Sequence, residues 1–186
     1  YTLIKVCIDP GHGGKDPGAV GNGGLTEASV NLTLARMLEQ KVSEYAEPLL
    51  TRKSNEYVSL QDRVELANQE KASFFISLHC NSVSNPNARG TETIYWPSSV
   101  EGRKLAEKIH PHLVSATGFK DRGIKPDQRG LYVLKHTKMP ALIVEVGFIS
   151  NPSEEAWMRN QEWLDDIAEA VSSGICEYLE EKGLIR

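Results

Sequence analysis

The sequence lacks the features that mark several classes of protein. No apolar run approaches the ~20 residues that a membrane-spanning helix needs. The three cysteines, Cys7, Cys80 and Cys176, are widely spaced, and they match neither a disulfide framework nor a zinc finger. Positive charge is not in excess, since the net charge is −4, and this predicts no general attraction to nucleic acid. The cysteines leave the redox compartment undecided.

Several motifs that carry chemistry are also absent. The sequence contains no GxxxxGK[ST], HExxH or GxSxG pattern. A GxGxxG pattern fails because Asp16 stands where the last glycine should be. There is no internal repeat and no low-complexity segment. These absences argue against a nucleotide P-loop, a dinucleotide fingerprint, a zincin helix and a nucleophile elbow.

The length and composition are those of an ordinary globular protein. The chain has 186 residues, of which 40% are hydrophobic and 25% are charged. This predicts one domain over residues 1–186, large enough for a substantial core without disulfides. The sequence begins at Tyr1 in an apolar run, without an initiator Met or a signal-peptide pattern. We therefore expect a trimmed domain or a mature product.

The hydrophobic pattern predicts alternating strands and helices. Strands are expected at 3–8, 48–51, 73–78, 92–96, 131–134 and 141–146. Helices are expected at 27–46, after Ser59, at 100–116, after Asn151 and at 163–179, with Pro111 kinking or splitting the third. Segments 9–24, 81–91 and 117–130 are expected to be loops. The prediction is a single α/β domain with a mixed, mostly parallel sheet of about six strands and helices on both faces.

Three of the expected strands lead into residues that can do chemistry. The first runs into a glycine-rich loop that carries His12, the run SFFISL ends at His79, and ALIV ends at Glu145. If these strands are parallel, their carboxyl ends meet at one edge, where ligands bind in open α/β sheets. Glu27, at the start of the helix after the glycine-rich loop, can reach the same edge. Two histidines and a carboxylate with an open fourth position are the usual ligands of a hydrolytic zinc ion, and Glu145 is left as a general base.

Other interpretations of these residues remain open. A glutamate in a first helical turn, such as Glu27, is more often solvated than metal-bound. Cys80 could be a nucleophile, but strand neighbours point to opposite faces, so His79 is badly placed as its base and a core role is favoured. His110 and His112 are expected at the surface of a helix. His136 could touch a substrate.

Taken together, seven segments resemble one enzyme family. They are DPGHGGKDPGA, LTEASVNL, LLTR, SLHCNS, GTETIYW, DRGIK and MPALIVEVGFISNP, in order from about Val6 to Pro152. This set resembles the zinc-dependent N-acetylmuramoyl-L-alanine amidases of the type-3 family. Cys80 departs from the usual alanine. The chain also lacks the long insertion that forms an autoinhibitory helix in some relatives, which implies an open site.

The resemblance implies a peptidoglycan hydrolase, an autolysin that cleaves the amide between N-acetylmuramic acid and L-alanine of the stem peptide. His12, Glu27 and His79 would bind one Zn²⁺ ion per chain, and Glu145 would be the catalytic glutamate. For Glu27 the resemblance therefore favours metal binding over exposure to solvent. Substrate carboxylates are expected to contact cationic or polar residues of two long loops, with solvated charges as the alternative: Asn81, Arg89, Arg122, Lys125 and Arg129. Arg52 and Arg63 could equally be structural.

The resemblance also implies a place and partners for the protein. Peptidoglycan would be its partner, outside the membrane at the cell wall or after secretion, without nucleic acid and without a membrane span. We expect a monomer that can be tethered to a wall-binding domain. Three rivals remain: a zinc peptidase that cuts within the stem peptide, a non-catalytic wall-binding module and a cysteine hydrolase. The identity of the new termini distinguishes the amidase from the peptidase. Sensitivity to a chelator and to thiol alkylation distinguishes a zinc enzyme from a cysteine hydrolase.

Overall fold

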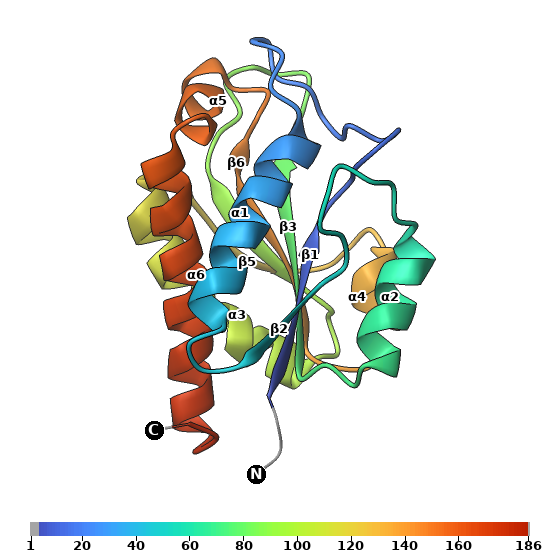
Figure 1. Ribbon diagram of the computed structural model, residues 1–186. Coiled ribbons are helices and arrows are strands. Elements are labelled where there is room, and N and C mark those ends of the chain that lie inside the picture. Colours follow the sequence, from blue (N-terminus) through green and yellow to red (C-terminus); the bar gives the residue numbers. More distant parts are fainter. Residues whose placement is uncertain (1–3, 186) are drawn as a thin grey trace.

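Six strands form one sheet in the order β2-β1-β3-β6-β4-β5 in the computed structural model (Figure 1). Their bounds are β1 Lys5–Pro10, β2 Glu47–Leu50, β3 Phe74–Asn81, β4 Thr91–Tyr95, β5 Asp121–Pro126 and β6 Ala141–Phe148. The first three and β6 are parallel, β4 is antiparallel to β6, and β5 is parallel to β4. The predicted mixed, mostly parallel sheet is confirmed. The structure describes residues 4–185, so the expected strand residue Leu3 and the chain start at Tyr1 lie outside it.

Helices cover both faces of the sheet, as predicted. Their bounds are α1 Glu27–Val42, α2 Leu60–Gln69, α3 Val100–Thr117, α4 Tyr132–His136, α5 Pro152–Met158 and α6 Gln161–Glu181. Figure 1 shows α1, α3 and α6 on one face and the shorter α2 and α4 on the other. The larger hydrophobic cluster lies under the three long helices, and a smaller one lies under α2 and α4. Among the described helices, none combines the length and apolar character needed to cross a bilayer.

The helix boundaries follow from local chemistry. Thr26 caps α1, since its side chain accepts a hydrogen bond from Ser29 N, and Leu34, Leu38 and Val42 pack into the core. The helix ends before the expected residue 46 because the chain must turn into β2. The third helix runs unbroken through Pro111, so the expected split is wrong. Pro111 lies on the exposed side of the helix, where solvent can hydrate the carbonyl that its missing N–H leaves unpaired.

Two segments of the sequence prediction are wrong. The expected strand at 131–134 forms the N-cap and the first residues of helix α4, and the expected loop at 117–130 contains strand β5. A four-residue apolar run does not distinguish a strand from a helical turn. The Asp127 carboxylate accepts hydrogen bonds from the N–H groups of Arg129 and Leu131, and this turns the chain into α4. The edge strand β5, DRGIKP, is too polar to show the usual strand pattern.

The sheet brings the predicted chemical residues to one edge. Strands β1, β3 and β6 are adjacent and parallel, so their carboxyl ends lie together. His79 in β3 is directly opposite Glu145 in β6, and Glu145 is opposite Glu92 in β4. Residues opposite each other on neighbouring strands share a face of the sheet. His79, Glu145 and Glu92 therefore form one row across the edge.

Candidate metal centre

Two buried arginines hold the glycine-rich loop that follows β1. Arg52 donates hydrogen bonds to the carbonyl oxygens of Pro10 and Gly11, and Arg63 donates to those of Pro10 and His12. Both side chains are almost fully buried. His12 has a φ of 63°, a left-handed conformation that a histidine keeps only when its surroundings enforce it. Both arginines therefore have the structural role, which is to fix the backbone that carries His12.

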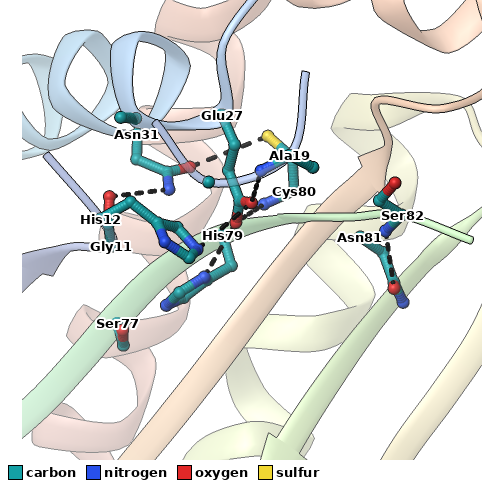
Figure 2. Close-up of polar contacts among 12 residues, drawn as sticks. Gly11, His12, Ala19, Glu27, Asn31, Ser77, His79, Cys80, Asn81 and Ser82 are labelled. Atoms are coloured by element: carbon teal, nitrogen blue, oxygen red, sulfur yellow. Dashed lines mark hydrogen bonds and ion pairs between the residues drawn. The ribbon is translucent and has the colours of Figure 1, made fainter. Parts of the chain in front are cut away.

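Three predicted ligands converge at this edge. The Nε2 atom of His12 is 3.3 Å from Glu27 Oε2, and the Nδ1 atom of His79 is 2.9 Å from Glu27 Oε1. Figure 2 shows the two imidazoles and the carboxylate directed toward one another. One ligand atom from each residue lies within 4.8 Å of the others. This spacing is compatible with a single ion held by all three side chains.

Other groups orient the three side chains. Asp16 Oδ2 is 2.8 Å from His12 Nδ1, which leaves Nε2 directed at the cluster. The two oxygens of Glu27 accept backbone N–H groups, Oε2 from Ala19 at 3.0 Å and Oε1 from Cys80 at 3.1 Å. Metal-binding histidines and carboxylates are commonly oriented by such partners. The cluster is thus held in place by groups outside the candidate ligand set.

A glycine makes room for the cluster. Gly18 has a φ of 66°, and a Cβ atom added there would lie 2.7 Å from both His12 Cδ2 and Glu27 Oε2. Any side chain at Gly18 would therefore displace two candidate ligands. This loop needs glycine for its backbone conformation and also for close approach to the site.

The electrostatics of the cluster favour bound positive charge. Burial lowers the pKa of His12, but hydrogen bonds and charge from Glu27 and Asp16 outweigh it and raise the pKa to about 9. Burial raises the pKa of Glu27, but His12 and His79 outweigh it and hold this pKa far below its usual range. Without an ion, the imidazoles take up protons to compensate the glutamate. Two imidazoles and one ionised carboxylate fit a zinc ion, which would replace those protons.

Glu145 is buried beside the cluster without a hydrogen-bond partner for one oxygen. Within residues 4–185, its Oε2 is the one buried side-chain nitrogen or oxygen atom that lacks a partner. Burial raises the pKa of Glu145 to about 7, while the charges of His79 and Arg129 oppose the rise. A buried unpaired carboxylate is costly, and a pKa near neutrality suits a group that both accepts and donates a proton.

The predicted substrate residues are divided between two places. Asn81, Arg122 and Lys125 all contact Glu92, at 3.1, 2.9 and 2.6 Å. Figure 2 shows Asn81 apart from the three candidate ligands. Arg89 instead lines a separate cavity with Trp157. Glu92 was not among the predicted site residues, although an acidic residue within an expected strand was a usable signal.

Cys80, His110 and His112 have contacts outside the candidate ligand set. Cys80 is buried with its Sγ 3.7 Å from Asn31 Oδ1, and burial raises its pKa well above the usual range, so it stays a thiol. The core role predicted for it is confirmed. The prediction that His110 is a surface residue is wrong, because its ring is buried between β4 and β5, 2.9 Å from Thr93 Oγ1. His112 pairs with Glu177 at the surface.

Comparison with known proteins supports what the geometry indicates. The family model described as N-acetylmuramoyl-L-alanine amidase matches residues 6–177. The chain belongs to this family. It is 38% identical over 176 residues to the N-acetylmuramoyl-L-alanine amidase LytC of Bacillus subtilis, covering 93% of the chain and 35% of LytC. The chain therefore spans about a third of that relative's length.

Two solved structures share the fold of this amidase-family chain over nearly its whole length. The crystal structure of an N-acetylmuramoyl-L-alanine amidase from Clostridium difficile 630 has a TM-score of 0.93 at 36% identity, covering 98% of this chain and 100% of that one. The catalytic domain of CwlV, from Bacillus (Paenibacillus) polymyxa var. colistinus, has a TM-score of 0.91 at 36% identity, covering 96% and 99%. The described residues thus have the single-domain α/β fold of amidase catalytic domains.

Proposed function

We propose that this chain is a zinc-dependent peptidoglycan amidase. It hydrolyses the amide between the lactyl group of N-acetylmuramic acid and L-alanine of the stem peptide. The observation that carries this proposal is the placing of the unpaired Glu145 oxygen beside three convergent ligand atoms, in a chain of the amidase family. Membership of the family indicates which amide is cleaved. The three candidate ligands and Glu145 are the groups that metal-assisted hydrolysis of an amide requires.

His12, Glu27 and His79 would hold one Zn²⁺ ion. A zinc ion at such a site supplies Lewis-acid polarisation of a carbonyl and acidifies water. Asp16 keeps His12 in the orientation that exposes Nε2, and the N–H groups of Ala19 and Cys80 hold the Glu27 carboxylate in place. These contacts preorganise the ligands before a substrate arrives.

Glu145 moves the proton during the reaction. Its ionised carboxylate takes a proton from the attacking water, whose oxygen forms a bond to the lactyl carbonyl carbon. Glu145 then gives this proton to the alanine nitrogen as the carbon–nitrogen bond breaks. The products are a free lactyl carboxyl group and a new amino-terminal alanine. A carboxyl with a pKa near 7 can perform both transfers at neutral pH.

The substrate implies the setting of the reaction. Peptidoglycan is the partner, so the chain would act outside the membrane, at the cell wall or after secretion. LytC is longer than this chain, which supports tethering to further wall-binding segments. Within the chain we propose a monomer with one site. Arg89, Arg122, Lys125 and Asn81 remain candidates for contacts with the substrate.

A digest of purified peptidoglycan tests the proposal. The digest is run with the protein as prepared, with a chelator, and with the chelator followed by zinc, and it is scored for new amino-terminal residues. We expect new amino-terminal alanine that disappears with the chelator and returns with zinc. New termini elsewhere in the stem peptide would assign a peptidase instead. Retention on the wall without any cleavage would assign a binding module.

A further inference from the structure

Two cavities open at the row of His79, Glu145 and Glu92, one at each end of it, since His79 lines the first and Glu92 lines the second. The first, of about 320 Å³, is lined by both candidate histidine ligands and lies between β1, α2 and α4. The second, of about 260 Å³, lies over β4 and β5. Ile143 in the first cavity is directly opposite Ile94 in the second, so both open on the same face of the sheet. The segment 127–132 separates them, since Asp127–Arg129 line the second cavity and Leu131–Tyr132 line the first.

The first cavity is aromatic and close to neutral. Tyr57 is 50% exposed and Tyr132 is 36% exposed, and Leu60 lies on the same rim. Arg63 is paired with Asp9 at 2.7 Å, so neither adds net charge. Lys15 lies 4.4 Å from the centre of the Tyr57 ring, and the Asp16 carboxylate that lines the same cavity carries the opposite charge. Exposed aromatic side chains around a cavity are typical of a surface that binds a ligand.

The second cavity has an unpaired cation. Glu92 is already compensated by Arg122 and Lys125. The carboxylate of Asp127 accepts backbone N–H groups. Arg129 lies exposed on the rim, and in the described part of the chain no carboxylate is within 4.0 Å of its guanidinium. This guanidinium can bind a carboxylate of a ligand in two-pronged geometry.

The two halves of the substrate differ in the same way as the two cavities. This step rests on the proposed function. In a muramyl peptide the lactyl carboxyl is tied up in the amide, so the sugar carries no charge, and its ring offers apolar C–H faces. The stem peptide carries free carboxylates. An uncharged ring is favoured against tyrosine faces, and a carboxylate is favoured against an unpaired guanidinium.

We propose that the N-acetylmuramic acid ring binds in the cavity lined by Tyr57 and Tyr132, and that a stem-peptide carboxylate binds Arg129 on the other side. The scissile amide then lies over the row of His79 and Glu145. This assigns a direction to the bound substrate. It also makes Tyr57 and Tyr132 the determinants for the sugar and Arg129 the determinant for the peptide.

Steady-state kinetics on three soluble substrates tests this direction. The first is a muramyl peptide with free stem carboxylates, the second is the same compound with those carboxylates amidated, and the third replaces the sugar with a methyl group on the lactyl oxygen. For the double variant Tyr57→Ala/Tyr132→Ala we expect KM to rise about tenfold for the first two substrates, with little change for the third. Trp157→Ala, which removes an exposed aromatic ring outside both cavities, is the control.

The variant Arg129→Ala tests the other side. We expect its KM to rise about tenfold for the substrate with free carboxylates and to stay near the wild-type value for the amidated one. Lys120→Ala removes an exposed cation outside both cavities and is the control. The proposal would be overturned if each variant raised KM equally for the two substrates that it is meant to distinguish. It would also be overturned if Arg129→Ala affected only substrates with the sugar and the tyrosine variant affected only substrates with free carboxylates.

A binding measurement keeps this test independent of the amidase activity. The methyl amide of N-acetylmuramic acid, which is uncharged and carries no peptide, is titrated into the Glu145→Gln protein and followed by amide NMR shifts. We expect shifts at residues 57–60 and 131–133, and their loss in the tyrosine double variant. Shifts confined to 125–129, or none at millimolar ligand, would contradict the sugar assignment. Failure of the wild type to release amino-terminal alanine would instead contradict the proposed function.

Discussion

Two buried carboxylates on the strands that flank β3 have opposite environments. Asp9 in β1 accepts hydrogen bonds from Thr51, Ser77 and Arg63, each between 2.6 and 2.7 Å. Glu145 in β6 has an oxygen, Oε2, without a hydrogen-bond partner among the residues that the structure describes. Burial raises the pKa of both, but at Asp9 the charge of Arg63 and the two hydroxyl groups outweigh it and lower the pKa, whereas at Glu145 burial dominates.

The difference separates a structural carboxylate from a reactive one. Asp9 is saturated with donors and pairs with Arg63, which in turn holds the backbone of the His12 loop. Among the described residues Glu145 Oε2 has no hydrogen-bond partner to offset its burial, and this leaves the oxygen free to exchange a proton with a substrate. The same residue class at the same sheet edge therefore serves stability in one strand and chemistry in another.

The largest expected effect is on turnover when Glu145 is made neutral. Glu145→Gln should lower kcat by about 10³–10⁴-fold, because the amide cannot accept and return the proton. Bound zinc should be retained, since Glu145 is outside the ligand set, and thermal stability should not fall. Kinetics, metal analysis and thermal unfolding check this. Glu162→Gln, an exposed control, should behave as wild type, and substantial residual turnover of Glu145→Gln would contradict its role.

Neutralising the other carboxylate should instead affect stability. Asp9→Asn leaves Arg63 buried without its ion-pair partner, so the free energy of unfolding should fall by about 3–5 kcal/mol. Urea denaturation measures the loss. The control is Glu107→Gln, which breaks the exposed pair with Arg103 and should cost less than about 1 kcal/mol. A small loss at Asp9 would show that the two carboxylates do not differ in this way.

The pH dependence of stability should separate the two carboxylates without relying on activity. The pKa of Glu145 is about 7 in the folded protein, whereas its ordinary value is 4.5. The protonated carboxyl therefore stabilises the fold fully below pH 4.5, and this stabilisation is lost as the pH rises through about 7. In metal-free protein, the stability of Glu145→Gln relative to wild type should therefore grow by about 3 kcal/mol across this window. Urea denaturation at a series of pH values in chelator measures it, and a constant difference would contradict the raised pKa.

Asp9 should show the opposite dependence. Its pKa is lowered from 3.8, so the stability it contributes is present at neutral pH and is lost as the pH falls below that value. The difference in free energy of unfolding between wild type and Asp9→Asn should thus stay constant from pH 4.5 to about 7. Over the same range the difference between wild type and Glu145→Gln should change. The same denaturation series provides this internal comparison.

The smallest expected effect concerns a carboxylate that acts through another residue. Asp16 is half-exposed and orients His12 through a 2.8 Å contact. Asp16→Ala should weaken zinc binding by about 10–100-fold while leaving the fold intact, since outer partners tune metal ligands. Competition with a chromophoric chelator measures this affinity. Unchanged affinity would show that the loop backbone alone orients His12.

The candidate site was more predictable than parts of the fold. Strands that end in His12, His79 and Glu145 are apolar and central, so their pattern is strong and their parallel arrangement places them at one edge. Strand β5 and helix α4 were predicted wrongly because one is a polar edge strand and the other has five residues. Their structure depends on β4 and on the Asp127 carboxylate, and neither effect is local in sequence.

Burial was the other quantity that local pattern could not predict. His110 lies in a helix of mixed character, and only the packing of α3 against β4 and β5 makes it a buried residue. Similarly, Glu92 was not recognised because its partners Arg122 and Lys125 belong to the strand that was expected to be a loop. Both depend on contacts between segments that are distant in the chain.

The sequence by itself determined the α/β class, the edge where the chemical residues meet and the family to which the chain belongs. The first two follow from hydrophobic periodicity and from residues at the ends of strands, and the family follows from the resemblance of seven sequence segments; all of these are local properties. Only the tertiary structure decided that Asp9 is saturated with donors while Glu145 Oε2 has no partner within residues 4–185. It also decided that Arg122 and Lys125 pair with Glu92 while Arg129 has no carboxylate partner in that part of the chain. Charge pairing and desolvation depend on distances between strands, and folding alone sets those distances.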